Sequence, residues 1–478
     1  MGNQSVLAGR SPAPTVGARR ASSRRVPYPH LHPGPGLSHE QVASHQRARI
    51  YAAMIELVAE RGYGAVTVLE LARLAGVSKH TVYEHFPGGK QECFLCTYEL
   101  IVRRSSKRVG AAQKDCRDWR ERLHLAFCAW ADGIAREPKA ARLALVEAFA
   151  GGLAALERMR RAEGLFEAMI DHSFARAPDG VVVAPLVVKG IVAGVHGVAR
   201  ARLLAGRAHE LPGVADELLE WMLCFRCQAA TALARLDDPP SLHRAAPAPL
   251  AIHGGAARGD DRARILDAVA RLAFEEGYWQ LTVPRIRSGA GVSRKRFDAH
   301  FEDVQGCFIA ALEHLTDRAL AHTAPAGAAA RSWPGGLHRA LVALCGYIAA
   351  DPVFARLGFI EVFAPGTDGM RCRARVIADV AESLRVSAPA GQRPSELAAE
   401  ASVGAIWGIV HRHVASGRAH QLPRVTGVLS YLALAPAVGA QQAVEAITAE
   451  QERMREVPPG ATGICPGVRR KEHRCRGV

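Results

Sequence analysis

The sequence has few aromatic residues: phenylalanine, tryptophan and tyrosine together make up 6% of its 478 residues. Segments in which apolar and polar residues alternate, as in half-buried strands, are also scarce. Both shortages disfavour a β-sandwich or a β-barrel. Alanine, leucine, arginine and glutamate dominate instead, and these residues favour helices. We therefore predict an all-α protein, and the length predicts about three domains at roughly 150 residues each.

Long hydrophobic runs are missing too. The most apolar stretch, Val181 to Val195, is short and is interrupted by Pro185 and Lys189, so we predict a helix of the core rather than a membrane span. No signal peptide is visible, because the arginine pairs near the N-terminus have no apolar run after them. We expect no membrane partner and a cytoplasmic location.

The sequence contains no nucleophile motif, phosphate-binding loop or paired-carboxylate site, which disfavours an enzyme, and we expect no cofactor. Its 11 cysteines are odd in number and irregularly spaced, which favours reduced, buried thiols over a disulfide framework. Cys93 with Cys96 and Cys224 with Cys227 have a spacing found in metal sites, but each pair lies within a predicted helix. Cys93 also recurs as Cys307 without a partner, so we predict no metal site.

Acidic residues are outnumbered, and the formal net charge is +15. A basic balance suits a polyanionic partner such as nucleic acid. Arginine-rich ends supply much of the excess, however, so the charge alone carries little weight.

One stretch, Val66 to Phe86, has the pattern of a helix, a tight turn and a second helix, and reads VTVLELARLAGVSKHTVYEHF. Thr67 is a good N-cap for the first helix, and Gly76 ends it. Ser78 caps the second helix, whose first turn presents Lys79, His80 and Thr81. This is helix-turn-helix geometry, in which the second helix reads base edges in the major groove of DNA.

A supporting helix, Arg47 to Arg61, precedes this stretch, with one apolar stripe at helical spacing and Gly62 and Tyr63 after it. The segment from Arg49 to Lys90 resembles the DNA-binding domain of the TetR family of repressors. The resemblance rests on the Gly-Tyr after the helix, the threonine cap, Leu-Ala, Ala-Gly-Val-Ser, Tyr-x-His-Phe and the lysine beyond them.

The resemblance implies a double-stranded DNA operator as partner and assigns roles by position. Lys79, His80 and Thr81 would face the groove, Tyr83 and Lys90 would hold phosphates, and Thr67 and Ser78 would cap helices next to phosphate. The residues that we expect to contact DNA in this first head are Thr67, Ser78, Lys79, His80, Thr81, Tyr83, His85 and Lys90.

The pattern restarts in the second half, where 262–301 repeats 47–86, and matching segments continue beyond it. Two copies of one unit, each with a head and a helical domain, explain this self-similarity. The predicted segments are a disordered basic arm (1–43), a first head (44–104), a first helical domain (105–236), a linker (237–258), a second, degenerate head (259–319), a second helical domain (320–449) and a disordered basic tail (450–478).

The second head departs from the first at three positions: Asp298 replaces Tyr83, Arg287 replaces Ala72, and Val304 replaces Lys90. A carboxylate at a phosphate contact weakens binding. Its second helix is nevertheless more basic, so it could still contact DNA loosely. Its candidate contacts are Ser293, Arg294, Lys295 and Arg296.

Relatives in the TetR family are typically two-fold dimers built on the last two helices of each subunit. Here the corresponding segments, about 185–235 and 396–449, are apolar on more than one face. We predict that they pack on each other as a pseudo-dimer within one chain. Association of two chains into a further homodimer stays open.

The resemblance also implies an effector, a small and often apolar molecule that releases DNA by changing the spacing of the heads. Plain core packing is the simpler explanation for any single aromatic side chain. The candidate lining residues are Phe127, Trp130, Phe149, Phe166 and Met169 in the first unit, and Tyr347, Phe359, Phe363 and Trp407 in the second.

The sequence therefore predicts a DNA-binding transcriptional regulator, a repressor relieved by an unidentified small molecule, with the first head as main reader. One alternative is a ligand-sensing interaction protein whose heads have lost specific DNA binding, which Asp298 supports. An enzyme built on the helical domain is a third possibility, for which no residues stand out.

Overall fold

The structure is a computed structural model, and it describes residues 38–227 and 260–456. Within these ranges the regular structure is helical and no strand occurs, so the prediction of an all-α fold is confirmed. The linker predicted at 237–258 and most of both predicted tails lie outside the described residues. Among the described residues, no single helix is long and apolar enough to cross a membrane; one bent pair, Trp333–Ala350 with Pro352–Phe363, meets only the length and composition test.

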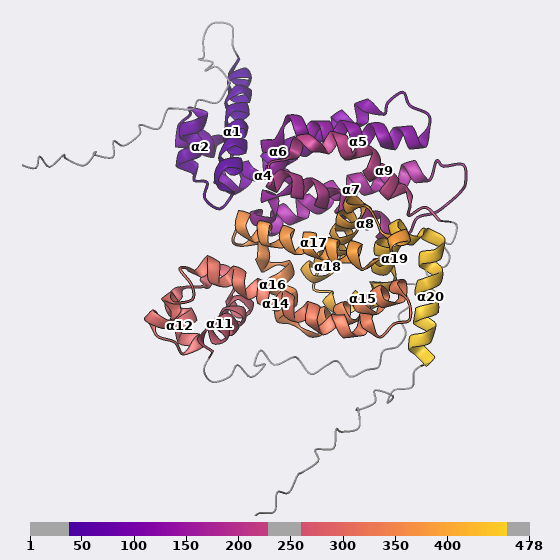
Figure 1. The fold of residues 1–478 in the computed structure, drawn as a ribbon. Helices are drawn as coiled ribbons and strands as arrows, with labels where there is room; N and C mark the ends of the chain where they lie inside the picture. The colour runs from indigo at the N-terminus through magenta and orange to yellow at the C-terminus, as the bar shows by residue number, and fades with distance from the viewer. Residues whose placement is uncertain (1–37, 228–259, 457–478) are drawn as a thin grey trace, which may run out of the picture.

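The first half of the chain forms a small head followed by a larger helical body (Figure 1). The elements of the head are α1 (His39–Arg61), α2 (Val68–Ala75), α3 (Lys79–His85) and the start of α4 (Gly89–Ala112). Those of the body are α5 (Trp119–Arg136), α6 (Pro138–Leu145), the 3-10 turn η1 (Glu147–Gly151), α7 (Leu153–Phe174), α8 (Pro185–Leu204), η2 (Ala208–Val214) and α9 (Ala215–Leu223).

The second half repeats this order. Its head consists of α11 (Asp261–Glu276), η3 (Tyr278–Gln280), α12 (Val283–Ala290), α13 (Arg294–Asp298) and the start of α14 (Val304–Ala328). Its body consists of α15 (Trp333–Ala350), α16 (Pro352–Phe359), η4 (Glu361–Phe363), α17 (Thr367–Ser387), η5 (Ala390–Gln392), α18 (Glu396–Ala415), η6 (Ala419–Val425), α19 (Thr426–Val438) and α20 (Ala440–Glu456).

Two predicted boundaries are wrong. The arm was expected to reach residue 43, but α1 begins at His39, because Ser38 and Gln41 form a reciprocal capping box at its N-terminus. The C-terminal tail was expected from residue 450, but α20 continues to Glu456. There the buried Glu450 accepts hydrogen bonds from Arg339 and Arg453, which ties the last turns of the helix to α15.

The two bodies share one apolar core, and α8 crosses α18 at its centre (Figure 1). Small residues allow the close approach: Gly197 faces Gly404, and a Cβ placed on Gly194 would lie 2.5 Å from the carbonyl oxygen of Ala401. Polar contacts flank the crossing, since the Trp221 indole donates to Ser402 over 3.1 Å and the Tyr431 hydroxyl donates to the Phe225 carbonyl over 3.0 Å.

Candidate nucleic-acid interface

The helix-turn-helix of the first head is fixed by local hydrogen bonds. Thr67 Oγ1 accepts from the Glu70 backbone N–H, and the Glu70 carboxylate accepts from that of Thr67, both over 3.2 Å. Gly76 takes the left-handed conformation, with φ of 64°, that ends α2. Ser78 Oγ then accepts from the Thr81 N–H over 2.9 Å and starts α3. The predicted caps of both helices are confirmed.

The turn is also anchored to α1. The buried Arg49 side chain donates through Nε to the Ala75 carbonyl over 2.7 Å, which satisfies a free carbonyl at the C-terminal end of α2. Val82 and Phe86 are buried beneath α3, and the Phe86 ring meets Tyr51 edge-on at 5.6 Å. The outer face of α3 is therefore held in a fixed orientation relative to the rest of the head.

That outer face carries the residues predicted to read DNA. Lys79 and His80 are exposed at the start of α3, and His80 pairs with Glu84 at 3.2 Å. Tyr83 follows one turn later, with 48% of its surface exposed although it is a large apolar side chain. Thr81 is half-buried, and its hydroxyl lies 2.9 Å from that of Ser78.

Two other predicted DNA contacts have partners inside the head. The Lys90 ammonium donates to the carbonyls of Tyr63 and Gly64, each over 3.3 Å, and lies 4.6 Å from the centre of the Tyr63 ring. His85 Nε2 lies 3.0 Å from Gln46 Oε1. Both side chains join helices of the head to one another, so any contact with phosphate would have to compete with these bonds.

The second head keeps the frame of the first. Thr282 and Ser293 cap α12 and α13, and Gly291 is left-handed with φ of 63°. The bond between Arg61 and Glu70 in the first head recurs with its charges exchanged, between Glu276 and Arg285. The exchange keeps the ion pair, although both residues differ between the two heads.

Its recognition helix differs in charge. Arg294 donates to Asp298 at 2.8 Å, and Arg296 donates to Asp261 at 3.1 Å. In the described part of the chain, Lys295 makes no ion pair. Two of the three basic side chains predicted to face DNA are therefore already paired with carboxylates, and α13 ends at Asp298, within its second turn.

A buried carboxylate joins each head to its own body. Glu147 Oε2 accepts from the Tyr63 backbone N–H over 3.2 Å, just after α1, and Glu361 Oε2 accepts from that of Tyr278 over 3.1 Å. An arginine one turn earlier pairs with each glutamate, Arg142 at 3.3 Å in the first unit. Arg142 also donates to the Thr367 hydroxyl of the second unit over 3.0 Å, so this joint contacts both halves of the chain.

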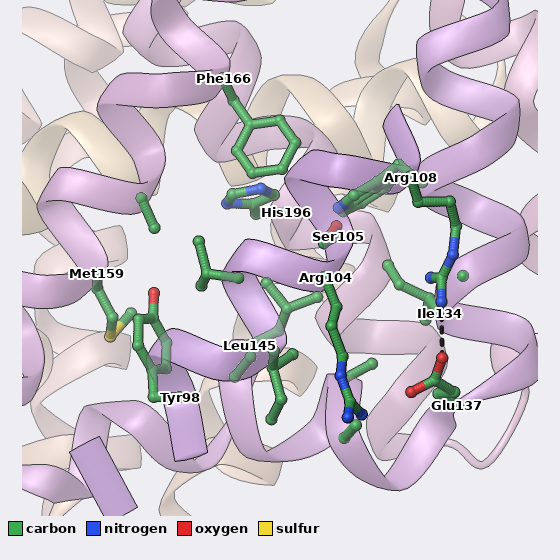
Figure 2. A pocket seen from close by; sticks show the side chains of 18 of the residues that line it. Tyr98, Arg104, Ser105, Arg108, Ile134, Glu137, Leu145, Met159, Phe166 and His196 are labelled. Atoms are coloured by element: carbon green, nitrogen blue, oxygen red, sulfur yellow. Dashed lines mark hydrogen bonds and ion pairs between the residues drawn. The ribbon is translucent and has the colours of Figure 1, made fainter. Parts of the chain in front are cut away.

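The body of the first unit contains two cavities. The larger, of about 800 Å³, lies among α4–α8, and Figure 2 shows Arg104, Arg108 and Glu137 at its edge, with a 2.6 Å ion pair between the last two. The second, of about 330 Å³, is lined almost wholly by apolar side chains. Four predicted effector residues line one or both cavities: Phe127, Trp130, Phe166 and Met169.

The other five predicted effector residues lie in three different places. Phe359 and Trp407 line an apolar cavity of about 1050 Å³ in the second unit. Phe149 and Phe363 instead stack on each other between the units, with ring centres 4.3 Å apart, although Phe149 also borders a space between the units. Tyr347 is buried against Phe354 and His322 and lines none of these cavities.

Buried arginines near the crossing of α8 and α18 were missed from the sequence. Arg200 and Arg373 are each 4% exposed, and the Nε atoms of both have no hydrogen-bond partner among the described residues. Arg412, half-buried nearby, donates to Glu163 and Glu167, each over 3.0 Å. A single arginine within an apolar helix gives no signal of burial, because its neighbours come from segments far away in the chain.

Two histidines packed inside the bodies, the buried His196 and the half-buried His411, should make stability depend on pH. Burial, with nearby arginines, lowers the pKa of both His196 and His411 to about 3. The unfolded chain takes up these protons near pH 6.5, whereas the folded chain does not until about pH 3, so stability is lost as pH falls through this window. At pH 5 each histidine should lower the free energy of unfolding by about 2 kcal/mol relative to pH 7.

His196→Phe tests this expectation, because phenylalanine keeps the ring that stacks 5.7 Å from Trp130. Denaturant titrations at pH 7 and pH 5 should differ by about 2 kcal/mol less in this variant than in the parent protein. His80→Phe, at an exposed position, is the matched control. An unchanged pH dependence in His196→Phe would contradict the assignment.

In the residues that the structure describes, no three histidine, cysteine, aspartate or glutamate side chains are placed to hold a metal ion. The nine cysteines in these ranges are free thiols. Burial raises the pKa of the Cys93 thiol to about 12 and that of Cys224 in the same direction, so neither is a ready thiolate ligand.

Comparisons with known proteins agree on the first head. Residues 50–96 match the family described as bacterial regulatory proteins, tetR family. The HTH-type transcriptional activator FasR of Mycolicibacterium smegmatis is 34% identical over 98 residues, which are 20% of this chain and 44% of the activator. The match thus spans less than half the length of that relative.

Solved structures of regulators are also similar. FadR from Bacillus halodurans, a regulator of fatty acid degradation, is 17% identical and covers 40% of this chain and 97% of its own, with a TM-score of 0.34. FadR from Bacillus subtilis, solved with stearoyl-CoA, is 16% identical and covers 37% and 96%, with a TM-score of 0.33. The family match over residues 50–96, together with the caps and core that form its helix-turn-helix, identifies the first head as a domain of the TetR family of bacterial regulatory proteins.

Proposed function

We propose that this protein is a sequence-specific DNA-binding transcriptional regulator and that the first head is its main reader. The observation that carries the proposal is the exposed face of α3, where Lys79, His80 and Tyr83 project from a helix whose opposite face is locked into the head. Helix-turn-helix proteins insert such a face into the major groove. The family match over residues 50–96 supports the same assignment.

The two units act as an intramolecular pseudo-dimer in this proposal. The close contact of α8 with α18 supports it, because those helices correspond to each other in the repeat. Successive major grooves on one face of DNA are about 34 Å apart, which is the spacing two heads must match. Since the heads differ in charge, we expect an operator that is not a perfect palindrome. Association of two chains is a possible further step.

We propose that an effector in the helical bodies releases DNA, which makes the protein a repressor acting on chromosomal DNA in the cytoplasm. A ligand lowers DNA affinity only if it binds better to the state in which the heads are wrongly spaced. The joints at Glu147 and Glu361 are where a shift in a body would reach a head. FasR is named an activator, so the opposite sign of regulation is the alternative.

A second candidate function is an interaction protein that senses a ligand and no longer reads DNA. The paired arginines of the second recognition helix favour it for that head. Lys79 of the first head argues against it, because it is exposed and makes no ion pair with any residue in 38–227 or 260–456. Catalysis has no support in the residues described above, and we propose none.

Titration of the full-length protein into DNA from upstream of its own gene tests the proposal. We expect a complex that competes successfully against a scrambled duplex of equal length. We also expect the logarithm of affinity to fall linearly with the logarithm of salt concentration, with a slope of about 0.9 for each phosphate that a lysine or arginine neutralises. Equal affinity for the scrambled duplex would reject sequence reading and favour the interaction protein.

A further inference from the structure

The cavity of the second unit is almost entirely apolar. It lies between α14, α15, α16, α17, α18 and α19 and has a volume of about 1050 Å³. Its walls include Leu312, Leu341, Ile348, Val376 and Val403. Ligand sites commonly combine apolar walls with a few placed polar groups, and an aliphatic chain is the ligand chemistry that such walls suit.

A single charged side chain, Arg373, lines this cavity. Its guanidinium carbon lies 3.7 Å from the centre of the Trp407 ring, on the wall of the same cavity. Both Nε and Nη2 of Arg373 are buried and have no hydrogen-bond partner among the described residues. Burying such donors without acceptors is costly. A bound acceptor would remove the cost.

The fold itself does not require an arginine at this position. The corresponding residue of the first unit is Met159, counted from the left-handed glycines that precede α7 and α17, Gly152 and Gly366. Met159 lines the larger cavity of the first unit, where the buried arginine is Arg200 of α8. The two units therefore place their buried arginines on different helices, on α8 in the first unit and on α17 in the second.

The charges near Arg373 leave an excess of positive charge. Four guanidinium groups lie at or near the crossing of α8 and α18, those of Arg160, Arg200, Arg373 and Arg412, and the charge of Arg200 acts on Arg373. The carboxylates facing them are Glu163 and Glu167, and both already bond to Arg412. Four cations against two anions suit a negatively charged ligand.

We propose that this cavity binds a long-chain aliphatic carboxylate, with its chain among the apolar walls and its carboxylate on Arg373. A planar guanidinium can donate two parallel hydrogen bonds to a carboxylate. The inference deepens the proposed function, because it names the chemical class of the effector and assigns the site to one unit of the chain.

The position of the site supplies contacts toward both heads. Trp407 stacks on His411 at 5.0 Å, and its ring also meets Phe363 edge-on at 5.9 Å. Phe363 in turn stacks on Phe149. These two phenylalanines each lie two residues after the glutamate that holds a head, Glu361 and Glu147. A carboxylate that moves Arg373 and Trp407 would thus act on side chains that lie two residues from each joint in the chain.

Calorimetric titration of the full-length protein with palmitate, and separately with hexadecanol, tests the site. The alcohol has the same chain and no charge. We expect palmitate to bind at one site per chain and at least tenfold more tightly than hexadecanol. Arg373→Met, which installs the residue of the first unit, should weaken palmitate binding at least tenfold and leave hexadecanol binding unchanged. Arg375→Met, on the exposed side of α17, is the control and should bind palmitate normally.

Unchanged palmitate binding in Arg373→Met, or equal affinity for palmitate and hexadecanol, would overturn the proposal. Palmitoyl-CoA that binds while palmitate does not would also overturn it, because recognition would then depend on a different anionic group. Arg373→Lys guards against a folding defect: it keeps the charge and should retain part of the affinity. Titration of operator DNA with and without palmitate tests the proposed release of DNA, independently of whether the site binds palmitate. Palmitate binding without any change in DNA affinity would uphold the site and reject release by an effector.

Discussion

Tyr83→Asp should weaken binding to the operator by about 30–150-fold, which corresponds to roughly 2–3 kcal/mol. The change gives the first head the residue that the second head has at this position, Asp298. It removes the phenol expected to meet a phosphate and adds a carboxylate that repels it. The new carboxylate would also lie one turn after Lys79, where it can pair with that ammonium as Asp298 pairs with Arg294.

Salt dependence separates this loss from unfolding. Because the new carboxylate offsets one positive charge on the DNA-binding face, the slope of log affinity against log salt should become shallower by up to about 0.9. Tyr83→Phe is the matched control, since it keeps the ring beside Gly89 and loses only the hydroxyl, and it should cost less than Tyr83→Asp. Affinity of Tyr83→Asp within twofold of the parent protein would show that this position does not face DNA.

Gly194→Ala should lower the free energy of unfolding by about 2 kcal/mol, although alanine is the better helix former. The added methyl group would lie 2.5 Å from the Ala401 carbonyl oxygen and 2.6 Å from the Trp221 ring. The first is backbone of α18, and the second is held by its bond to Ser402, so neither can move cheaply. Overpacking of this kind costs about 1–3 kcal/mol.

Gly164→Ala is the control for the helix effect. Gly164 lies within α7 and has no atom within 4 Å of the position of a Cβ. This variant should be more stable than the parent by up to about 1 kcal/mol. The same chemical change at two helical glycines should therefore shift the denaturation midpoint in opposite directions. A stabilised Gly194→Ala would mean that α8 and α18 are not in close contact in solution.

The parts of the fold that depend on local sequence could be predicted. Thr67, Gly76 and Ser78 determine where α2 and α3 begin and end, because each acts on a backbone only a few residues away. The second head followed from the repeat of these residues. The start of α1 was misplaced, because the capping box of Ser38 and Gln41 lies in a stretch whose composition indicated disorder.

The parts that depend on packing between distant segments could not be predicted. Phe149 and Phe363 were expected in effector pockets, but they stack on each other where the two units meet. Helical periodicity shows which face of a helix is apolar and does not show which helix covers it. The same limit hid Arg373, because the ring that covers it, Trp407, lies on a different helix, α18.

The most direct test of the account compares the two heads within one chain. Lys79→Ala with His80→Ala removes the exposed face of α3, and Arg294→Ala with Lys295→Ala removes the corresponding residues of α13. Both double variants are titrated against operator DNA and against a scrambled duplex. We predict that the ratio of operator affinity to scrambled-duplex affinity falls at least tenfold in the first variant. The second variant should retain most of this ratio. Equal losses of preference from both heads would contradict the claim that the first head reads the sequence.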